Sequence, residues 1–269
     1  MTASTMEAPL ALHARTYGTG SRKAIALHCS LAHSGAWRGV AQQLEDDLTI
    51  TALDLPGHGK SPVWGGHGDL TEETLKALLP LITEPVDLIG HSFGGVLSLL
   101  IALEKPEMVR SLSLFEPVLM AVAREDAPEL HQWNCAHMDE INAHIEAGDP
   151  AMGARIFLRV WGDGRPWDAL PEELQKTATR LIPFIGASQP ALADDNTNLI
   201  PRLGQITAPC VLMDGGQSPA LMKTVQDGLA ARIPNARRAT LATAGHMGPI
   251  THAAEVAAEI RKTMAKVPA

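Results

Sequence analysis

A serine on a predicted tight turn has the clearest chemical potential in this sequence. The stretch "VDLIGHSFGGVLSLL" places Gly90 and Gly94 two residues before and after Ser92, between a strand-like apolar run and a helix-like one. A serine exposed on such a turn needs strained backbone angles, and the two glycines remove the Cβ atoms that would collide. The N-terminus of the following helix offers free N–H groups to a developing oxyanion. The pattern therefore predicts that Ser92 is a nucleophile.

Four short motifs, taken in order, resemble those of the α/β-hydrolase superfamily. They are "LHCSLAHSGAW" at 27–37, "DLPGHGKS" at 54–61, "GHSFGG" at 90–95 and "AGHMGPI" at 244–250. The resemblance covers nearly the whole chain outside residues 118–200. It implies an α/β protein with the α/β-hydrolase fold, in which helices flank a mostly parallel sheet and a helical lid is inserted after the sixth strand.

The resemblance also implies roles for individual residues. Ser92 corresponds to the family's nucleophile and His246, in a late loop, to the general base that takes its proton. The oxyanion hole would use the backbone N–H of Phe93 and that of Ser30. The loop that carries Ser30 normally begins His-Gly, and here Cys29 stands in place of the glycine. If the family glycine has a positive φ, Cys29 would be strained there.

The acid of the expected triad is not at its usual position. In "PCVLMDGGQSP" the residue where the family carries aspartate is Ser218, and a hydroxyl cannot supply the negative charge that steadies an imidazolium. The chain order Ser, acid, His leaves two strand ends between Ser92 and His246. Glu116 follows "SLSLF" and is the preferred acid, because some relatives place theirs at this earlier strand end. Asp214 is the alternative, although neighbouring strand residues point to opposite faces.

Short apolar runs bounded by turn residues alternate with helix-like stretches, and this pattern predicts a parallel sheet with helices on both faces. A helix is expected from Gly94 to Pro106, and the chain should close with an amphipathic helix at 252–267. The predicted strands lie at 24–29, 49–55, 86–90, 111–115, 210–214 and 236–242.

The texture of the sequence changes between 118 and 200, where several helices and no convincing strand are expected. We interpret this stretch as a helical lid, and residues 1–117 and 201–269 as the hydrolase core. Trp133, Trp161 and Trp167, with Met120, Met138 and Met152, all fall in the lid. Some of them could line an apolar pocket over Ser92, but the sequence does not indicate which ones.

Composition limits the range of partners. The chain has 269 residues, of which 45% are hydrophobic, enough to bury a substantial core. With 30 acidic and 22 basic residues its net charge is -8, which argues against a nucleic-acid partner. It has no run of about 18 apolar residues, so no membrane partner is expected. A small-molecule substrate is the expected partner, and the oligomeric state is left open.

Cysteines and histidines give little support to a disulfide framework or a metal site. The three cysteines are Cys29, Cys135 and Cys210, an odd number without a CxxC pair, which favours the cytoplasm. In the lid, His137 and His144 share one helix face while His131 and Cys135 share another. Neither face collects three ligands, so no metal and no cofactor are expected.

The motifs together predict a serine hydrolase that cleaves an ester-like bond, a carboxylic ester or a lactone, in a small and fairly apolar substrate. Carbon–carbon bond hydrolases use the same triad, but many carry tryptophan after the late histidine, where Met247 stands here. A non-catalytic ligand-binding protein on a degenerate hydrolase fold is the alternative from another class, since fold does not dictate function.

Overall fold

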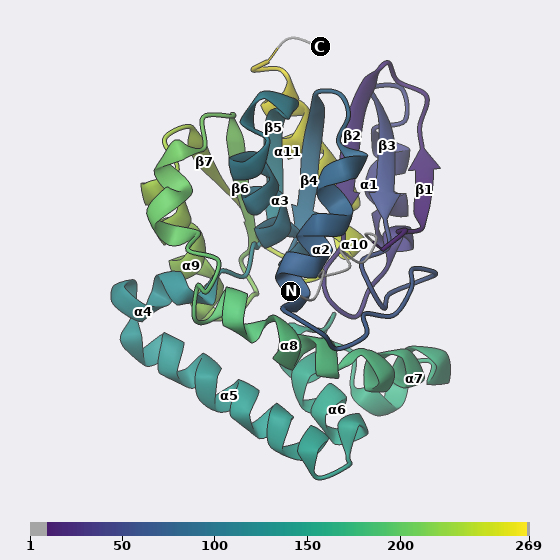
Figure 1. The fold of residues 1–269 in the computed structure, drawn as a ribbon, viewed down its shortest axis with the longest axis vertical. Coiled ribbons are helices and arrows are strands. Elements are labelled where there is room, and N and C mark those ends of the chain that lie inside the picture. The colour runs from purple at the N-terminus through teal and green to yellow at the C-terminus, as the bar shows by residue number, and fades with distance from the viewer. Residues whose placement is uncertain (1–9, 268–269) are drawn as a thin grey trace, which may run out of the picture.

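A twisted seven-stranded sheet organises the computed structural model, which describes residues 10–267 of the chain (Figure 1). The strand order is β1-β3-β2-β4-β5-β6-β7, with β1 antiparallel to β3 and every other neighbouring pair parallel. The strands are β1 (Ala14–Tyr17), β2 (Arg22–Leu27), β3 (Leu48–Leu53), β4 (Val86–His91), β5 (Val109–Phe115), β6 (Cys210–Gly215) and β7 (Ala236–Leu241). The predicted mostly parallel sheet is confirmed.

Helices cover both faces of this sheet, which explains the continuous apolar runs of its central strands. Every residue of β4 and of β6 is buried. The helices around the sheet are α1 (Arg38–Gln43), α2 (Leu70–Leu78), α3 (Phe93–Glu104), α9 (Ala220–Arg232), α10 (Gly248–Thr251) and α11 (Ala253–Met264). The helices expected from Gly94 and at 252–267 correspond to α3 and α11.

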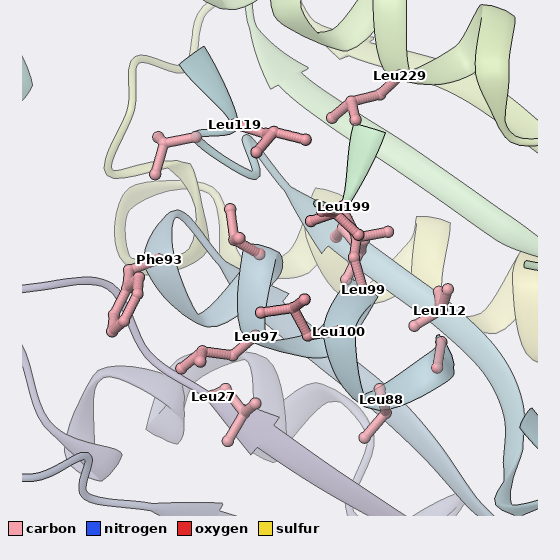
Figure 2. Close-up of a cluster of buried hydrophobic side chains, with 14 of the residues drawn as sticks. Leu27, Leu88, Phe93, Leu97, Leu99, Leu100, Leu112, Leu119, Leu199 and Leu229 are labelled. Carbon is pink, nitrogen blue, oxygen red and sulfur yellow. The ribbon is translucent and has the colours of Figure 1, made fainter. Parts of the chain in front are cut away.

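The two faces of the sheet belong to two hydrophobic clusters, because successive strand residues point in opposite directions. Leu88 lies in the cluster that contains α2, α3 and α9, and Ile89 in the one that contains α1 and α11. Figure 2 shows the first cluster, in which Leu97 and Leu100 of α3 lie against Leu27 and neighbouring strand residues. The nearly complete burial of α3 fixes the helix that begins directly after Ser92.

The carboxyl ends of the parallel strands meet at one edge of the sheet, and the register aligns them closely. Leu27 of β2 pairs with Gly90, and Phe115 of β5 pairs with His91 on one side and with Met213 on the other. The residues that follow β2, β4, β5 and β6 are therefore neighbours in space although they are far apart in the sequence.

A separate group of helices lies across this edge, below the sheet in Figure 1. It has a small core of its own, to which Met138, Ile141, Ile156 and Ile185 belong. Its members are α4 (Ala123–Asp126), α5 (Pro128–Glu146), α6 (Pro150–Trp161), α7 (Glu172–Leu181) and α8 (Pro183–Leu192). Short 3-10 helices complete the described structure: η1 (Ser34–Trp37), η2 (Leu79–Leu81), η3 (Pro106–Met108), η4 (Met120–Val122), η5 (Trp167–Ala169) and η6 (Ile200–Gln205).

The position of this helical group corrects one expectation. The lid was expected after the sixth strand, but in the described chain the helical group follows β5, the fifth. Five strands, β1 to β5, precede the helical group in the described chain, one fewer than the resemblance implies. The group still leaves the sheet next to β4, the strand that ends directly before Ser92, because β5 pairs with β4. No helix within residues 10–267 is both long and apolar enough to cross a membrane.

Candidate active site

Ser92 occupies a sharp turn between β4 and α3. Its backbone angles, φ 57° and ψ -118°, lie outside the regions that side-chain-bearing residues favour, so this turn stores strain. The turn is fixed by its own hydrogen bonds: the N–H of Ser92 donates to the carbonyl of Phe115 (3.0 Å), and the N–H of Gly95 donates to the carbonyl of Ser92 (2.9 Å). Such a turn holds the serine side chain at the strand's carboxyl end.

The glycines around Ser92 are required by space. A Cβ on Gly94 would lie 2.2 Å from the carbonyl oxygen of Leu27. A Cβ on Gly90 would lie 2.6 Å from Oγ of Ser98 and 2.7 Å from the backbone of Gly94. The G-x-S-x-G pattern therefore reflects the close approach of α3 to the ends of β2 and β4, as the sequence predicts.

His246 and Glu116 form a buried pair at the same edge. His246 lies in the loop between β7 and α10, and its Nδ1–H donates to Oε2 of Glu116 at 2.6 Å. The other oxygen, Oε1, accepts the backbone N–H of Gly215 at 2.8 Å. Glu116 is fully buried and has a φ of 44°, directly after β5. Since Nδ1 is bonded to Glu116, Nε2 of His246 is the nitrogen left to face a reacting group.

His91 and Trp161 pack against the His246 ring. The Nε2–H of His91 donates to the carbonyl of His246 at 2.8 Å, and the two rings lie 5.0 Å apart. Burial lowers the pKa of His91 well below the usual value, so this ring is neutral. The ring of Trp161, on α6, packs edge-to-face against the His246 ring, with the ring centroids 5.1 Å apart. The sequence did not single out His91, although it is the first variable residue of the G-x-S-x-G motif.

Asp214 is placed away from His246. Its Oδ1 accepts hydrogen bonds from Nη2 of Arg238 (2.6 Å) and from Oγ1 of Thr240 (3.0 Å), both on β7. Ser218 is half-buried in the following turn. Of the two candidate acids, the structure therefore brings Glu116 to His246 and pairs Asp214 with an arginine.

The loop after β2 carries Ser30, the second predicted oxyanion donor. Ser30 lines the same cavity as Ser92, and no hydrogen bond acceptor is found for the N–H of Ser30 or of Phe93 in residues 10–267. The strain considered for Cys29 is absent: the positive φ in this loop, 65°, belongs to Leu31. Burial raises the pKa of the Cys29 thiol to about 12, so it stays protonated and is a poor nucleophile.

Two buried histidines fix this loop. Nε2 of His28 accepts the N–H of Leu55 (3.0 Å) while its Nδ1–H donates to the carbonyl of Cys29 (2.7 Å). Nε2 of His58 accepts the N–H of Leu31 (3.2 Å). An imidazole can accept only when it is neutral. Burial lowers the pKa of His28 to about 3 and that of His58 to about 4, which keeps both rings neutral.

A cavity lies over Ser92 and His246, between the sheet edge and the helical group. Of the lid residues named from the sequence, Met120, Met138 and Trp161 line it. Trp133 and Met152 are instead 42% and 36% exposed. The other apolar lining residues are Leu31, Ala32, Val118, Phe157, Leu158, Leu170, Leu174, Ala178, Ile185, Leu192 and Met247.

The lid histidines do not gather around a common point. His131 Nδ1 lies 3.8 Å from Cys135 Sγ, while His137 stacks on Trp133 with ring centroids 5.5 Å apart. Across the described part of the chain, no group of three or more His, Cys, Asp or Glu side chains is arranged to hold a metal ion.

Comparison with known proteins decides the family. The sequence model of the alpha/beta hydrolase family matches residues 24–259. The chain belongs to this family. Lipase LipV of Mycobacterium tuberculosis is 28% identical over 94% of this chain and 97% of its own length. A pimeloyl-[acyl-carrier protein] methyl ester esterase of Stenotrophomonas maltophilia is 26% identical over 90% of this chain and 92% of its own.

A solved structure shows the same fold for this hydrolase. MGS-M2, an alpha/beta hydrolase enzyme from a Medee basin deep-sea metagenome library, superposes with a TM-score of 0.77. The alignment covers 96% of this chain and 95% of the other, at 14% sequence identity. At this identity the likeness concerns the fold alone.

We expect acid to destabilise this hydrolase before its carboxylates titrate. Buried His28 and His58 have pKa values of about 3 and about 4, below the value of about 6.5 of an unfolded histidine. The unfolded state therefore binds more protons below about pH 6.5. The contribution of these histidines to the free energy of unfolding is fully present above that pH. Toward pH 4 the free energy of unfolding falls by up to about 1.4 kcal/mol per pH unit for each histidine.

Urea unfolding at about pH 7.5, 6.5, 5.5 and 5 measures this effect. A His58→Gln variant should show a slope that is shallower by up to about 1.4 kcal/mol per pH unit, the share of one histidine. A free energy of unfolding that stays constant from pH 7 to pH 5 would contradict the neutral, buried state of these rings.

Proposed function

We propose that this protein is a serine hydrolase that cleaves carboxylic esters or lactones of small, fairly apolar compounds through the triad Ser92, His246 and Glu116. The observation that carries the proposal is the 2.6 Å contact between Nδ1 of His246 and the buried carboxylate of Glu116, at a cavity that Ser92 and His246 both line. A nucleophile, a base and a group that orients the base are the parts that acyl transfer through serine requires.

In the first half of the reaction Ser92 Oγ attacks the carbonyl carbon of the ester, and Nε2 of His246 takes the serine proton. The carbonyl oxygen becomes an oxyanion that accepts hydrogen bonds from the N–H groups of Phe93 and Ser30. His246 then gives its proton to the departing alkoxide, and the alcohol leaves. Ser92 is left as an acyl ester.

The second half releases the acid. His246 takes a proton from a water molecule, which attacks the acyl carbon, and the same two N–H groups hold the second oxyanion. Collapse of this intermediate breaks the bond to Ser92 Oγ, which regains its proton from His246. The products are a carboxylic acid and free enzyme.

Glu116 stabilises the imidazolium that exists in both halves. Its carboxylate fixes the tautomer with the proton on Nδ1 of His246 and supplies the compensating negative charge. The N–H of Gly215 holds the carboxylate from its other oxygen at 2.8 Å. Gly215 belongs to the turn after β6, where the family usually carries its acid. Here its N–H stabilises a different acid, Glu116, which follows β5.

The cavity supports a small, apolar acyl group. Its walls are mostly apolar side chains, leucines and methionines chief among them, and a pocket of this kind binds by burying apolar surface. Residues 118–200 would act as the lid over it, with Trp161 closing the site above His246. The two relatives are named a lipase and a methyl ester esterase, and both names denote hydrolysis of carboxylic esters.

A burst experiment with p-nitrophenyl butyrate tests the proposal. We expect about one equivalent of p-nitrophenol in a fast phase when acylation outpaces deacylation, followed by steady turnover, because the acyl-enzyme forms on a single serine. A protein that binds the ester without releasing p-nitrophenol above the spontaneous rate would instead be the non-catalytic alternative. Lactones of similar size, followed by acid release, extend the same assay.

A further inference from the structure

The loop between β2 and η1 carries Ser30 and begins against the turn of the nucleophile. A Cβ on Gly94, two residues after Ser92, would lie 2.7 Å from the carbonyl oxygen of His28. Leu31 in this loop has a φ of 65°, a conformation that residues with side chains rarely adopt. A strained backbone of this kind persists only where its surroundings hold it. The groups that hold the loop therefore decide where its N–H groups point.

His28 holds the peptide unit to which the Ser30 N–H belongs. Its Nδ1–H donates to the carbonyl oxygen of Cys29 at 2.7 Å, and the same oxygen accepts the N–H of Ala32 at 3.2 Å. A trans peptide unit such as this one is planar, so its C=O and N–H point in opposite directions. Fixing the Cys29 carbonyl therefore fixes the direction of the Ser30 N–H. Hydrogen bonds to the carbonyl also polarise the unit and make that N–H a stronger donor.

His58 holds the next peptide unit, which joins Ser30 to Leu31. Its Nε2 accepts the N–H of Leu31 at 3.2 Å, while its Nδ1–H donates to the carbonyl of Pro56 at 2.8 Å. Rotating this peptide unit would relieve the positive φ of Leu31, but it would turn the carbonyl of Ser30 toward the Nε2 lone pair. Two acceptors cannot bond each other, so His58 opposes the rotation.

The partners of the two rings come from the "DLPGHGKS" motif, which has no part in the chemistry described above. Leu55 donates its N–H to Nε2 of His28 at 3.0 Å, and His58 belongs to the motif itself. Asp54 adds a third contact, because its Oδ1 accepts the N–H of Ser34 at 2.6 Å. The motif and the loop after β2 are thus one hydrogen-bonded unit, in which each ring donates from Nδ1 and accepts at Nε2.

We infer that His28 and His58 are positioning residues of the oxyanion hole, which hold the two peptide units around Ser30 so that its N–H stays available to the developing oxyanion. The inference rests on the proposed ester hydrolysis, in which this N–H stabilises both oxyanions. Neither histidine belongs to the lining of the cavity over Ser92. Their effect on the rate therefore passes through the backbone of the loop. A donor held in place before the reaction needs no reorganisation during it.

Asparagine and glutamine separate the two hydrogen bonds of each ring. The asparagine amide lies where Nδ1 lies in histidine and can donate in its place, whereas the glutamine amide reaches the position of Nε2 and can accept there. His28→Asn therefore keeps the bond to Cys29, and His28→Gln loses it. For His58 the assignment is reversed, because His58→Gln keeps the bond to Leu31 and His58→Asn loses it.

We expect a crossed pattern in kcat for p-nitrophenyl butyrate. His28→Gln should lower kcat by about 100-fold and His58→Asn by about tenfold, because a misplaced oxyanion donor costs nearly as much as a missing one. His28→Asn and His58→Gln should recover most of the wild-type kcat. KM should change little, since the N–H acts on the transition state. Urea unfolding should show similar stabilities for the two variants of each histidine, because each variant loses one hydrogen bond.

A transition-state analogue tests whether the loss occurs at the oxyanion. Butyl trifluoromethyl ketone adds to Ser92 Oγ and forms a hemiketal oxyanion. Its Ki should rise in the same variants and by about the same factor as kcat falls, because both report stabilisation of that oxygen. His137→Asn and His137→Gln are the matched controls, at a buried histidine of α5 outside the cavity lining, and should not differ from each other in kcat.

The outcomes separate this inference from the proposed function. Equal kcat in the two variants of each histidine, or values of kcat that follow only the free energy of unfolding, would overturn the positioning role while the wild-type activity upholds the hydrolase. If the variants of one histidine do not fold, the pair at the other histidine decides. A wild-type protein that hydrolyses no ester would overturn the proposed function and this inference with it.

Discussion

Replacing Ser92 by alanine is expected to lower kcat for p-nitrophenyl butyrate by about 10,000-fold or more, to near the spontaneous rate. Without Oγ there is no acyl-enzyme, and serine hydrolases that lose their nucleophile keep only what binding and the oxyanion hole provide. The fast phase of p-nitrophenol release should vanish with it. Stopped-flow absorbance followed by steady-state rates measures both effects.

The fold should tolerate this change, because alanine fits wherever serine does at this turn. Ser218→Ala is the matched control: this serine stands where the family usually places its acid, and it does not line the cavity over Ser92 and His246. We expect the control to keep the wild-type rate within about twofold, as most substitutions outside a catalytic site do. A folded Ser92→Ala variant with the wild-type rate would contradict the assignment of the nucleophile.

Glu116→Gln is expected to lower kcat by about 1,000- to 10,000-fold. The amide keeps the size of the side chain and can still accept the N–H of Gly215, but it carries no charge to stabilise the His246 imidazolium and favours the wrong tautomer. Steady-state kinetics with p-nitrophenyl butyrate measures the loss. Circular dichroism at increasing temperature shows whether the variant is folded.

Asp214→Asn is the control for the acid, because it removes the competing carboxylate. Its partners are Arg238 and Thr240, so the change should weaken a contact between β6 and β7 and affect turnover by less than about fivefold. A large loss of kcat in Asp214→Asn together with near-normal turnover in Glu116→Gln would show that the acid assignment is wrong.

The position of Glu116 could be predicted from the sequence because it depends on local patterns. The end of an apolar strand, the order of the chain and the missing aspartate at Ser218 were all readable. The hydrogen bond from the N–H of Gly215 to the Glu116 carboxylate could not be predicted. Gly215 is 99 residues away in the sequence, and only the pairing of β5 with β6 brings it to Glu116. The pairing of Asp214 with Arg238 and Thr240 depends on the same kind of long-range contact, here between β6 and β7.

Other features depended on burial, which residue types alone do not fix. The strand Ala14–Tyr17 was not predicted, because it is a short edge strand that alternates between exposed and half-buried residues. Its absence from the prediction matters little for the site. The strands that carry the site, by contrast, are buried on both faces and gave long apolar runs.

The cavity wall shows the same limit. Trp133 and Trp161 are the same residue type in neighbouring helices, yet one is 42% exposed and the other 3%. Which face of α5 or α6 turns toward Ser92 depends on how the helical group packs on the sheet edge. The burial of Asn134, which lies on α5, lines the cavity and is 2% exposed, could not be predicted for the same reason. An asparagine in a polar helix is usually exposed to solvent.

The most direct test of the central claim is to label the folded protein with a fluorophosphonate and map the modified peptide by mass spectrometry. We predict one equivalent of label, on Ser92, with a labelling rate that falls about as much in Glu116→Gln as kcat does, because both depend on the base that Glu116 orients. Absence of label on the folded wild-type protein, or label on a residue other than Ser92, would contradict the account.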